Sequence, residues 1–239
     1  MNNVKEERLQ KILSQAGISS RREAEKMIEK GIVKVNNRIA KLGDKATFND
    51  LITVNNQAIQ KAEKVYYIIN KPEKTICSLK DPQNRTLIVD YIDEPRMIFP
   101  VGRLDYNTTG TLLLTNDGEL ANRLTHPSYE IIRVYRARLN EVLSNEELAF
   151  LNSSKVFLDN HQSIQTVEKI ENKTYVISLK VGSYHHVKKL FELVNKDVKN
   201  LTRIEFAGLT HVGKLSRGQY RKLNAKEIYW LKKLVKLEQ

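Results

Sequence analysis

Residues 102–110 read Gly102-Arg103-Leu104-Asp105-Tyr106-Asn107-Thr108-Thr109-Gly110 and form a polar segment between two apolar runs. The runs are Met97–Val101 before the segment and Thr111–Thr115 after it. Glycines at both ends predict a strand, an exposed turn and a second strand, with the strands at Ile98–Leu104 and Thr111–Thr115. Aspartates are common in turns for structural reasons alone, but a turn between two core strands also holds a reactive carboxylate rigidly. Asp105 is therefore a candidate catalytic residue.

The charge of the chain is strongly basic and unevenly placed. Its formal net charge is +12 over 239 residues. Residues 1–62 carry 12 Lys and Arg against 7 Asp and Glu, residues 63–179 carry 14 against 16, and residues 180–239 carry 14 against 5. Two basic ends around a near-neutral middle indicate a polyanionic partner, and we favour nucleic acid over an acidic membrane surface.

Cysteine content and hydropathy exclude several classes of protein. The single cysteine, Cys77, rules out a disulfide framework and a thiolate zinc site. No apolar run approaches the length of a membrane span, and the first residues contain no apolar signal core. We therefore expect a cytoplasmic protein that does not contact membranes.

The first part of the chain predicts a compact module of two helices and a hairpin. Leu9, Ile12 and Leu13 recur at helical spacing, and Ser20 and Glu23 have the spacing of a capping box at the start of a second helix. Apolar and polar residues then alternate around an Asn-Asn turn within Ile32–Ile39, which is typical of a hairpin.

Basic residues are concentrated on this module. Arg21 and Arg22 lie in the first turn of the second helix, where positive charge opposes the helix macrodipole, so phosphate contact is a better explanation than local stability. The stretches Glu7–Lys11, Gly17–Ala24 and Ile28–Asn36 resemble the alpha-L RNA-binding fold. That resemblance implies that the paired arginines and the hairpin face structured RNA. The candidate RNA-binding residues are Arg21, Arg22, Lys30, Lys34 and Arg38.

The remainder predicts a larger α+β domain. Residues 57–64 form a polar connector, so we expect an RNA-binding domain at 1–60 and a catalytic domain at 64–239. Apolar and alternating runs predict strands that follow one another as hairpins and meanders, with helices between them. This order favours a mainly antiparallel mixed sheet flanked by helices.

The chemistry available around Asp105 needs neither metal nor cofactor. An aspartate with an ordinary pKa of about 3.9 is ionised at neutral pH and needs only a rigid turn and a nearby cation. Candidate cations are Arg103 and the pair Lys188-Lys189, while His185 and His186 lack a third residue at metal-ligand spacing. No nucleophile elbow and no glycine-rich phosphate loop is present. We therefore expect no metal and no cofactor.

A second resemblance extends over nearly the whole chain. Residues 102–118 resemble the signature of the RsuA/RluB branch of pseudouridine synthases, which act on ribosomal RNA. Four further segments match this family in its order: Tyr67–Pro72, His126–Tyr135, Gly182–Glu192 and Gly218–Leu223. The family differs in having arginine where this chain has Ser183 and Lys188, glycine in place of Lys74, and Lys-Thr-Tyr in place of Arg133-Val134-Tyr135.

The resemblance implies a role for each matching residue. Asp105 would be the catalytic aspartate, and Tyr135 would lie against the flipped uracil. Lys188 would pair with the aspartate. Val187 and Arg103 would line the substrate pocket. The implied reaction breaks the N1–C1′ bond of a uridine, turns the base and joins its C5 to C1′, with Asp105 acting as a nucleophile or as a base.

The expected partner is ribosomal RNA, either free or within a subunit assembly intermediate, and the expected protein is a monomer. The first module and the Asp105 segment are most similar to the large-subunit branch, whereas Tyr184–Lys189 is more similar to the small-subunit branch. A non-catalytic rRNA-binding or ribosome-assembly factor is the alternative from another class. The presence of both Asp105 and Tyr135 favours an enzyme.

Overall fold

The structure is a computed structural model that describes residues 6–237, and it divides into two compact units. The first unit contains the chain up to Val65 together with two short segments, Glu94–Ile98 and Asn116–Gly118. The second unit contains the rest. Each unit has its own hydrophobic core.

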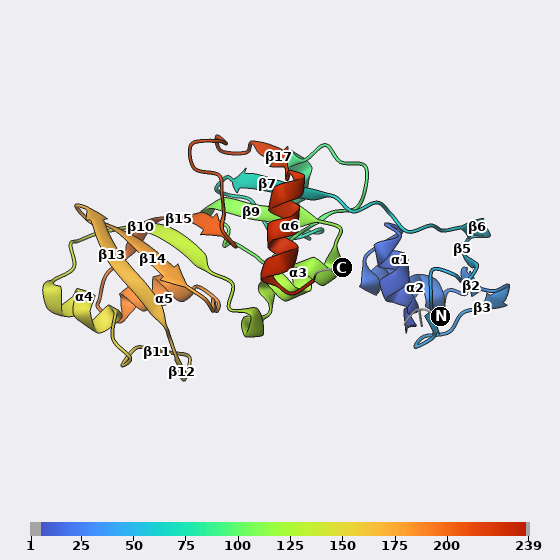
Figure 1. The fold of residues 1–239 in the computed structure, drawn as a ribbon, viewed down its shortest axis with the longest axis horizontal. Coiled ribbons are helices and arrows are strands. Elements are labelled where there is room, and N and C mark those ends of the chain that lie inside the picture. Colours follow the sequence, from blue (N-terminus) through green and yellow to red (C-terminus); the bar gives the residue numbers. More distant parts are fainter. Residues whose placement is uncertain (1–5, 238–239) are drawn as a thin grey trace. The chain divides into compact units, whose positions relative to one another are not determined.

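Two helices and a four-stranded sheet build the first unit (Figure 1). The helices are α1 (Leu9–Gln15) and α2 (Arg21–Glu29). The sheet has the order β3-β2-β5-β6, and its strands are β2 (Val33–Val35), β3 (Arg38–Ile39), β5 (Ile52–Val54) and β6 (Gln57–Ala58). The short strands β1 (Glu7–Arg8) and β4 (Lys45–Ala46) pair separately.

Local sequence accounts for this module. Leu9, Ile12 and Leu13 are buried as the helical period predicts, and Ser20 Oγ accepts a hydrogen bond from the backbone N–H of Glu23 at 3.3 Å. Asn36 and Asn37 both have positive φ, at 49° and 66°, which a two-residue hairpin turn between twisted strands requires. The predicted helices and hairpin are therefore present.

A nine-stranded mixed sheet forms the centre of the second unit. Its main path has the order β13-β14-β10-β15-β9-β7-β17, while β8 pairs with β9 and β16 with β15. All pairs are antiparallel except β15 with β9. The strands are β7 (Tyr66–Lys71), β8 (Phe99–Pro100), β9 (Thr109–Thr115), β10 (Arg133–Leu139), β13 (Gln165–Glu171), β14 (Thr174–Leu179), β15 (Val198–Phe206), β16 (Leu209–Thr210) and β17 (Tyr220–Lys222). This is the α+β fold class that the sequence predicts.

Two groups of helices cover different parts of the sheet, and each builds a separate core cluster (Figure 1). Helices α3 (Gly118–Thr125) and α6 (Ala225–Leu234) supply apolar side chains to a cluster with β7, β9 and the end of β15. Helices α4 (Asn145–Leu151) and α5 (His186–Glu192) do the same with β10, β13 and β14. A small hairpin of β11 (Phe157–Leu158) and β12 (His161–Gln162) and two 3-10 turns, η1 (Ile88–Tyr91) and η2 (Pro127–Tyr129), complete the unit.

One predicted element is wrong in its extent. The expected strand Ile98–Leu104 is reduced to β8, which ends at Pro100. Gly102 has a φ of +74°, which a continuing strand cannot accommodate. The chain therefore leaves the sheet before Asp105 and re-enters it at Thr109, two residues earlier than predicted. Within residues 6–237, no helix has the length and apolar character needed to span a bilayer.

Candidate active site

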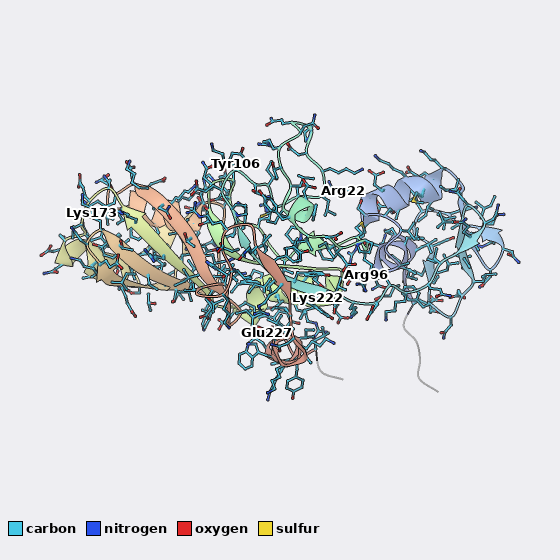
Figure 2. All side chains as sticks on the ribbon, turned by 90° about the horizontal axis from the view of Figure 1, so that it is seen from above. Arg22, Arg96, Tyr106, Lys173, Lys222 and Glu227 are labelled. Atoms are coloured by element: carbon cyan, nitrogen blue, oxygen red, sulfur yellow. The ribbon has the colours of Figure 1, made fainter. Side chains whose placement is uncertain are left out.

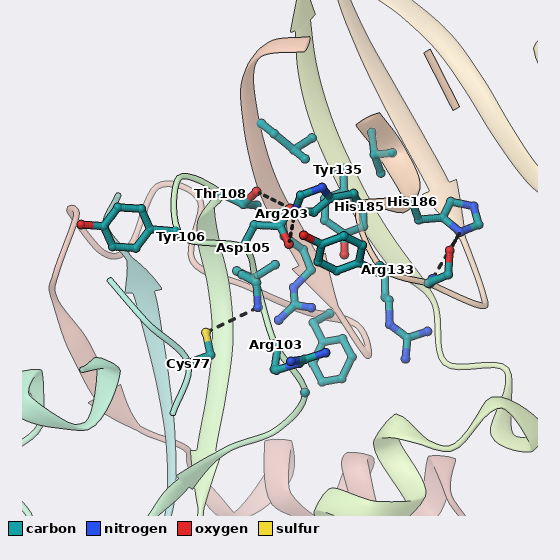
Figure 3. Close-up of a pocket in the computed structure, with 18 of the residues that line it drawn as sticks. Cys77, Arg103, Asp105, Tyr106, Thr108, Arg133, Tyr135, His185, His186 and Arg203 are labelled. Carbon is teal, nitrogen blue, oxygen red and sulfur yellow. Dashed lines mark hydrogen bonds and ion pairs between the residues drawn. The ribbon is translucent and has the colours of Figure 1, made fainter. Parts of the chain in front are cut away.

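Asp105 begins a tight turn directly before β9. The backbone N–H of Thr108 donates to the carbonyl of Asp105 at 3.0 Å, and the Thr108 hydroxyl lies 3.5 Å from Oδ2 of the same aspartate. Figure 3 shows Tyr106 turned away from the Asp105 carboxylate. The Asp105 side chain is 29% exposed, so it is reachable from solvent while the backbone of its turn is held in place.

A buried lysine holds this turn from beneath. Lys71, the last residue of β7, has no exposed surface. Its Nζ donates to the carbonyls of Asp105, Tyr106 and Thr108 at 2.9–3.2 Å, and to that of Pro72 at 3.0 Å. Burial lowers the pKa of Lys71 to about 8, while the nearby Cys77, Asp105 and Glu73 act in the opposite direction. Because a buried ammonium is costly unless its hydrogens find acceptors, these contacts tie the turn firmly to β7.

Helix α5 and the residue before it bring two nitrogen groups, from Lys188 and His185, to the carboxylate. Nζ of Lys188 lies 3.5 Å from Oδ2 of Asp105, and Nε2 of His185 lies 3.6 Å from Oδ1. His185 precedes the helix with a φ of +55°, in the left-handed region that few non-glycine residues adopt. Such strain is typical of functional sites. The neighbouring Lys189 contacts Asp159 instead, with Nζ 2.6 Å from a carboxylate oxygen.

These groups open onto a pocket of about 700 Å³ whose lining residues all belong to the second unit. Asp105, Tyr135, Val187 and Arg103, four of the residues that the sequence singles out, line it. Figure 3 shows Asp105 and Tyr135 at the same cavity, although they come from the turn before β9 and from β10. Lys188 reaches the pocket through its contact with Asp105. The volume lies within the range of small-molecule sites.

Arg103 is placed differently from the expectation that it could serve as a cation for Asp105. Its side chain lines the pocket, but it makes no ion pair with any residue in the part of the chain that the structure describes.

Tyr184 stacks on the imidazole of His185, with ring centroids 3.8 Å apart, and is 67% exposed. The pocket therefore has an exposed aromatic surface at its rim, which suits stacking by a nucleic-acid base.

A buried arginine lies in the pocket wall. Arg203 on β15 is 2% exposed, donates from Nε to the carbonyl of Thr111 at 2.8 Å and stacks its guanidinium 4.7 Å from the ring centre of Phe206. Its Nη2 is the one buried side-chain nitrogen or oxygen without a hydrogen-bond partner among residues 6–237. An unmet buried donor is rare, so this guanidinium adds hydrogen-bonding capacity to the pocket wall.

The parallel pair of β9 and β15 requires a glycine beside the site. Gly110 has a φ of +110°, and a Cβ at this position would lie 2.2 Å from the carbonyl oxygen of Arg203. Only glycine therefore allows the strand that follows the Asp105 turn to approach β15. This close approach places the turn and Arg203 next to the same pocket.

The residues that the sequence singles out for RNA binding all lie in the first unit, away from any pocket residue in sequence. Arg21, Arg22 and Lys30 are exposed and make no ion pair or side-chain hydrogen bond with another described residue (Figure 2 labels Arg22 on α2). Lys34 instead donates to Asn56 at 2.9 Å, and Arg38 pairs with Asp44 at 2.9 Å. The charges of the first three side chains are therefore unpaired within the described part of the chain.

Three residues of the site have no role predicted from the sequence: Arg203 and His185, which line the pocket, and Lys71, which supports the Asp105 turn. Lys71 lies in the matched segment Tyr67–Pro72, which is its only sequence signal. Arg203 lies on β15 among polar and apolar residues, and its position in the sequence does not distinguish it from an exposed strand residue. Among the described residues, no group of three or more His, Cys, Asp or Glu side chains is placed to hold a metal ion.

Comparison with known proteins defines the class. Residues 65–193 match the family model described as RNA pseudouridylate synthase, and residues 7–52 match that of the S4 domain. A solved structure described as "Crystal structure of pseudouridylate synthase" aligns with a TM-score of 0.69 at 27% identity, covering 94% of this chain and 99% of that one. The chain therefore belongs to the RNA pseudouridine synthase family and is an enzyme of that class with an N-terminal S4 domain.

Relatives define the branch. Ribosomal large subunit pseudouridine synthase B of Bacillus subtilis is 38% identical over 237 residues, which cover 95% of this chain and 96% of that protein. The protein of the same name in Escherichia coli K12 is 35% identical, with 97% and 84% covered. An uncharacterised RNA pseudouridine synthase of Aquifex aeolicus is 38% identical, with 98% and 96% covered. Within the family the chain belongs to the RsuA/RluB branch.

Proposed function

We propose that this enzyme converts a uridine of large-subunit ribosomal RNA to pseudouridine, with Asp105 as the catalytic residue. The observation that carries the proposal is the position of the Asp105 carboxylate. It lies at a pocket of about 700 Å³, and Nζ of Lys188 is 3.5 Å away. The names of the Bacillus and Escherichia relatives support the large subunit as the target.

The pocket supports a division of roles among its residues. A uridine inside folded RNA is unreachable until it leaves its stack, which costs a few kcal/mol, and the pocket is large enough to receive the extruded base. Val187 and Tyr135 then lie against the base, and Arg103 lies at the wall near its sugar and phosphate. Lys188 orients Asp105, since its Nζ lies 3.5 Å from Oδ2 of the carboxylate.

The reaction requires three changes at the nucleotide: the N1–C1′ bond breaks, the free uracil turns within the pocket, and C5 bonds to C1′. The proton that C5 loses is balanced by the proton that N1 gains once it is free of the sugar. The Asp105 carboxylate acts on the sugar or the base as a nucleophile, or removes a proton from the sugar as a base. Tyr135, which lines the same pocket, assists loss of the C5 proton. Isomerisation needs no outside oxidant or reductant, because product and substrate have the same composition.

The RNA is also held outside the pocket. Arg21, Arg22 and Lys30 in the S4 domain contact phosphates of the substrate, and Lys34 and Arg38 do so once their present partners release them. One chain contains every residue that lines the pocket, so a monomer suffices for turnover. We propose the cytoplasm as its place of action, on free rRNA or on an assembly intermediate.

Replacement of Asp105 by Asn tests the proposal. Wild-type protein should release tritium from large-subunit rRNA labelled at uracil C5, whereas Asp105→Asn should release none and still bind the RNA. Asp93→Asn is a matched control, because Asp93 is exposed, belongs to the second unit and does not line the pocket. Equal release by wild type and Asp105→Asn would refute the catalytic role. Release from small-subunit rRNA alone would reassign the target.

A further inference from the structure

A second concave surface lies away from the Asp105 pocket. It is a groove of about 450 Å³ in the second unit, which we call the arginine groove. Six polar or charged residues that line it are used below: Arg136, Arg138, Asn200, Thr202, His211 and Arg217. None of its lining residues is acidic.

The arginine groove lies on the opposite face of the sheet from the Asp105 pocket. In the β10–β15 pair, Tyr135 is the partner of Arg203, and both line the pocket. The next residues along each strand, Arg136 and Thr202, are partners of each other and line the groove. Successive side chains of a strand point to opposite faces, so the two strands carry the pocket on one face and the groove on the other.

The charge of the groove has little compensation within the protein. Arg136 and Arg138 are exposed, and neither makes an ion pair or a side-chain hydrogen bond with a residue in the range 6–237. Arg217 pairs with Glu73 at 3.3 Å, but both side chains are largely exposed, and such pairs are weak. The rim therefore presents two unpaired guanidinium groups and a third that is easily released.

The floor of the groove is polar but uncharged. His211 is 7% exposed and contacts the Thr111 hydroxyl through Nδ1 at 2.7 Å, and burial lowers its pKa. The Thr202 hydroxyl is 2.7 Å from that of Thr109. Guanidinium groups above such a floor match the geometry of phosphate oxygens, which arginine binds bidentately.

From these observations we propose that the arginine groove is a second RNA-binding site, which holds a phosphodiester segment of the substrate on the face of the sheet opposite the active site. The proposal rests on the proposed rRNA substrate. A ribosomal RNA is long enough to present further phosphates beyond its target nucleotide. A concave site lined by fixed strand residues suits one such segment better than it suits a flat membrane surface.

The salt dependence of RNA binding tests this site. Arg136→Gln/Arg138→Gln removes both unpaired charges, and their exposure means that the melting temperature should not change. Each lost phosphate contact lowers the magnitude of the slope of log affinity against log salt by about 0.7 on single strands, so the double variant should lose about 1.4. Lys155→Gln/Lys169→Gln is the control, because both lysines are exposed outside the pocket and the groove.

The outcomes separate this site from the proposed function. A slope that falls in the arginine variant and not in the lysine control supports the groove, even if no variant or wild type releases tritium, in which case only the proposed reaction fails. An unchanged slope in the arginine variant overturns the groove, whatever the turnover. Binding to phosphatidylglycerol vesicles that the arginine variant alone loses, with RNA binding unaltered, would also overturn it in favour of a membrane surface.

Discussion

Nζ of Lys188 lies 3.5 Å from Oδ2 of Asp105, and the two residues belong to elements that are distant in the chain. Lys188 is in the first turn of α5, where a positive charge opposes the helix macrodipole. The positive charge of Lys188 therefore disfavours the helix slightly, while it attracts the Asp105 carboxylate. Both side chains are about one-third exposed, so solvent weakens the attraction, and orientation of Asp105 is the larger effect.

We expect Lys188→Met to lower kcat by roughly 10²-fold, the range seen when one electrostatic partner of a reacting group is removed. Lys188→Arg should retain most activity, because a guanidinium can pair with the same carboxylate. Single-turnover tritium release at saturating RNA measures the effect. Lys189→Met is the control, since Lys189 contacts Asp159 instead. Full activity of Lys188→Met would show that Asp105 needs no partner from α5.

The burial of Lys71 predicts how the free energy of unfolding changes with pH. Its pKa of about 8 in the folded protein is below the value of about 10.4 expected for an unfolded chain. Between these values the unfolded chain binds more protons, so this group makes the free energy of unfolding rise with pH from about 8 to about 10.4. The wild type should therefore gain stability relative to Lys71→Met across that window, by up to about 3 kcal/mol.

Urea unfolding of both proteins at about pH 7.5 and about pH 9.5 measures the change, and the contributions of groups that do not interact with Lys71 cancel in the difference. A difference that stays constant with pH would show that Lys71 keeps an ordinary pKa among its carbonyl partners.

Gly110 tests the close approach of β9 and β15. Gly110→Ala should destabilise the second unit by roughly 2–5 kcal/mol, the sum of a left-handed backbone cost and an overpacking cost against the Arg203 carbonyl. Gly213→Ala should cost only about 1–2 kcal/mol, because Gly213 also has a positive φ but has no atom within 4 Å of the added Cβ. Thermal or urea unfolding of the two variants compares them directly. Similar losses would contradict the steric explanation.

The exposed arginines of the S4 domain predict how rRNA binding depends on salt concentration. Arg21→Ala/Arg22→Ala should weaken rRNA binding and lower the magnitude of its salt slope by about 0.7 for each phosphate contact on single strands, or about 0.9 on duplex. Lys41→Gln/Lys45→Gln provides a control on exposed lysines of the same unit. A slope that is the same as that of the wild type would mean that the two arginines do not touch phosphate.

The structure of the first unit could be predicted from the sequence because local interactions determine it. Its helix ends follow from Ser20 as a cap, its hairpin from Asn36 and Asn37, and its core from the spacing of Leu9 and Ile12. Each of these signals involves residues within a few positions of one another. The same locality explains the wrong strand at Ile98–Leu104, because the apolar run there continues past Pro100 while the backbone at Gly102 does not.

The sequence by itself determined the two modules, the antiparallel character of most of the sheet and the turn that presents Asp105. The tertiary structure decided which groups surround that carboxylate. Only folding places Lys71 beneath the turn, Lys188 and His185 beside the carboxylate, and Arg203 in the same wall through the parallel pairing of β9 and β15. Strand pairing and burial join residues far apart in the chain, and neither spacing nor periodicity along one segment records which distant segment it will meet.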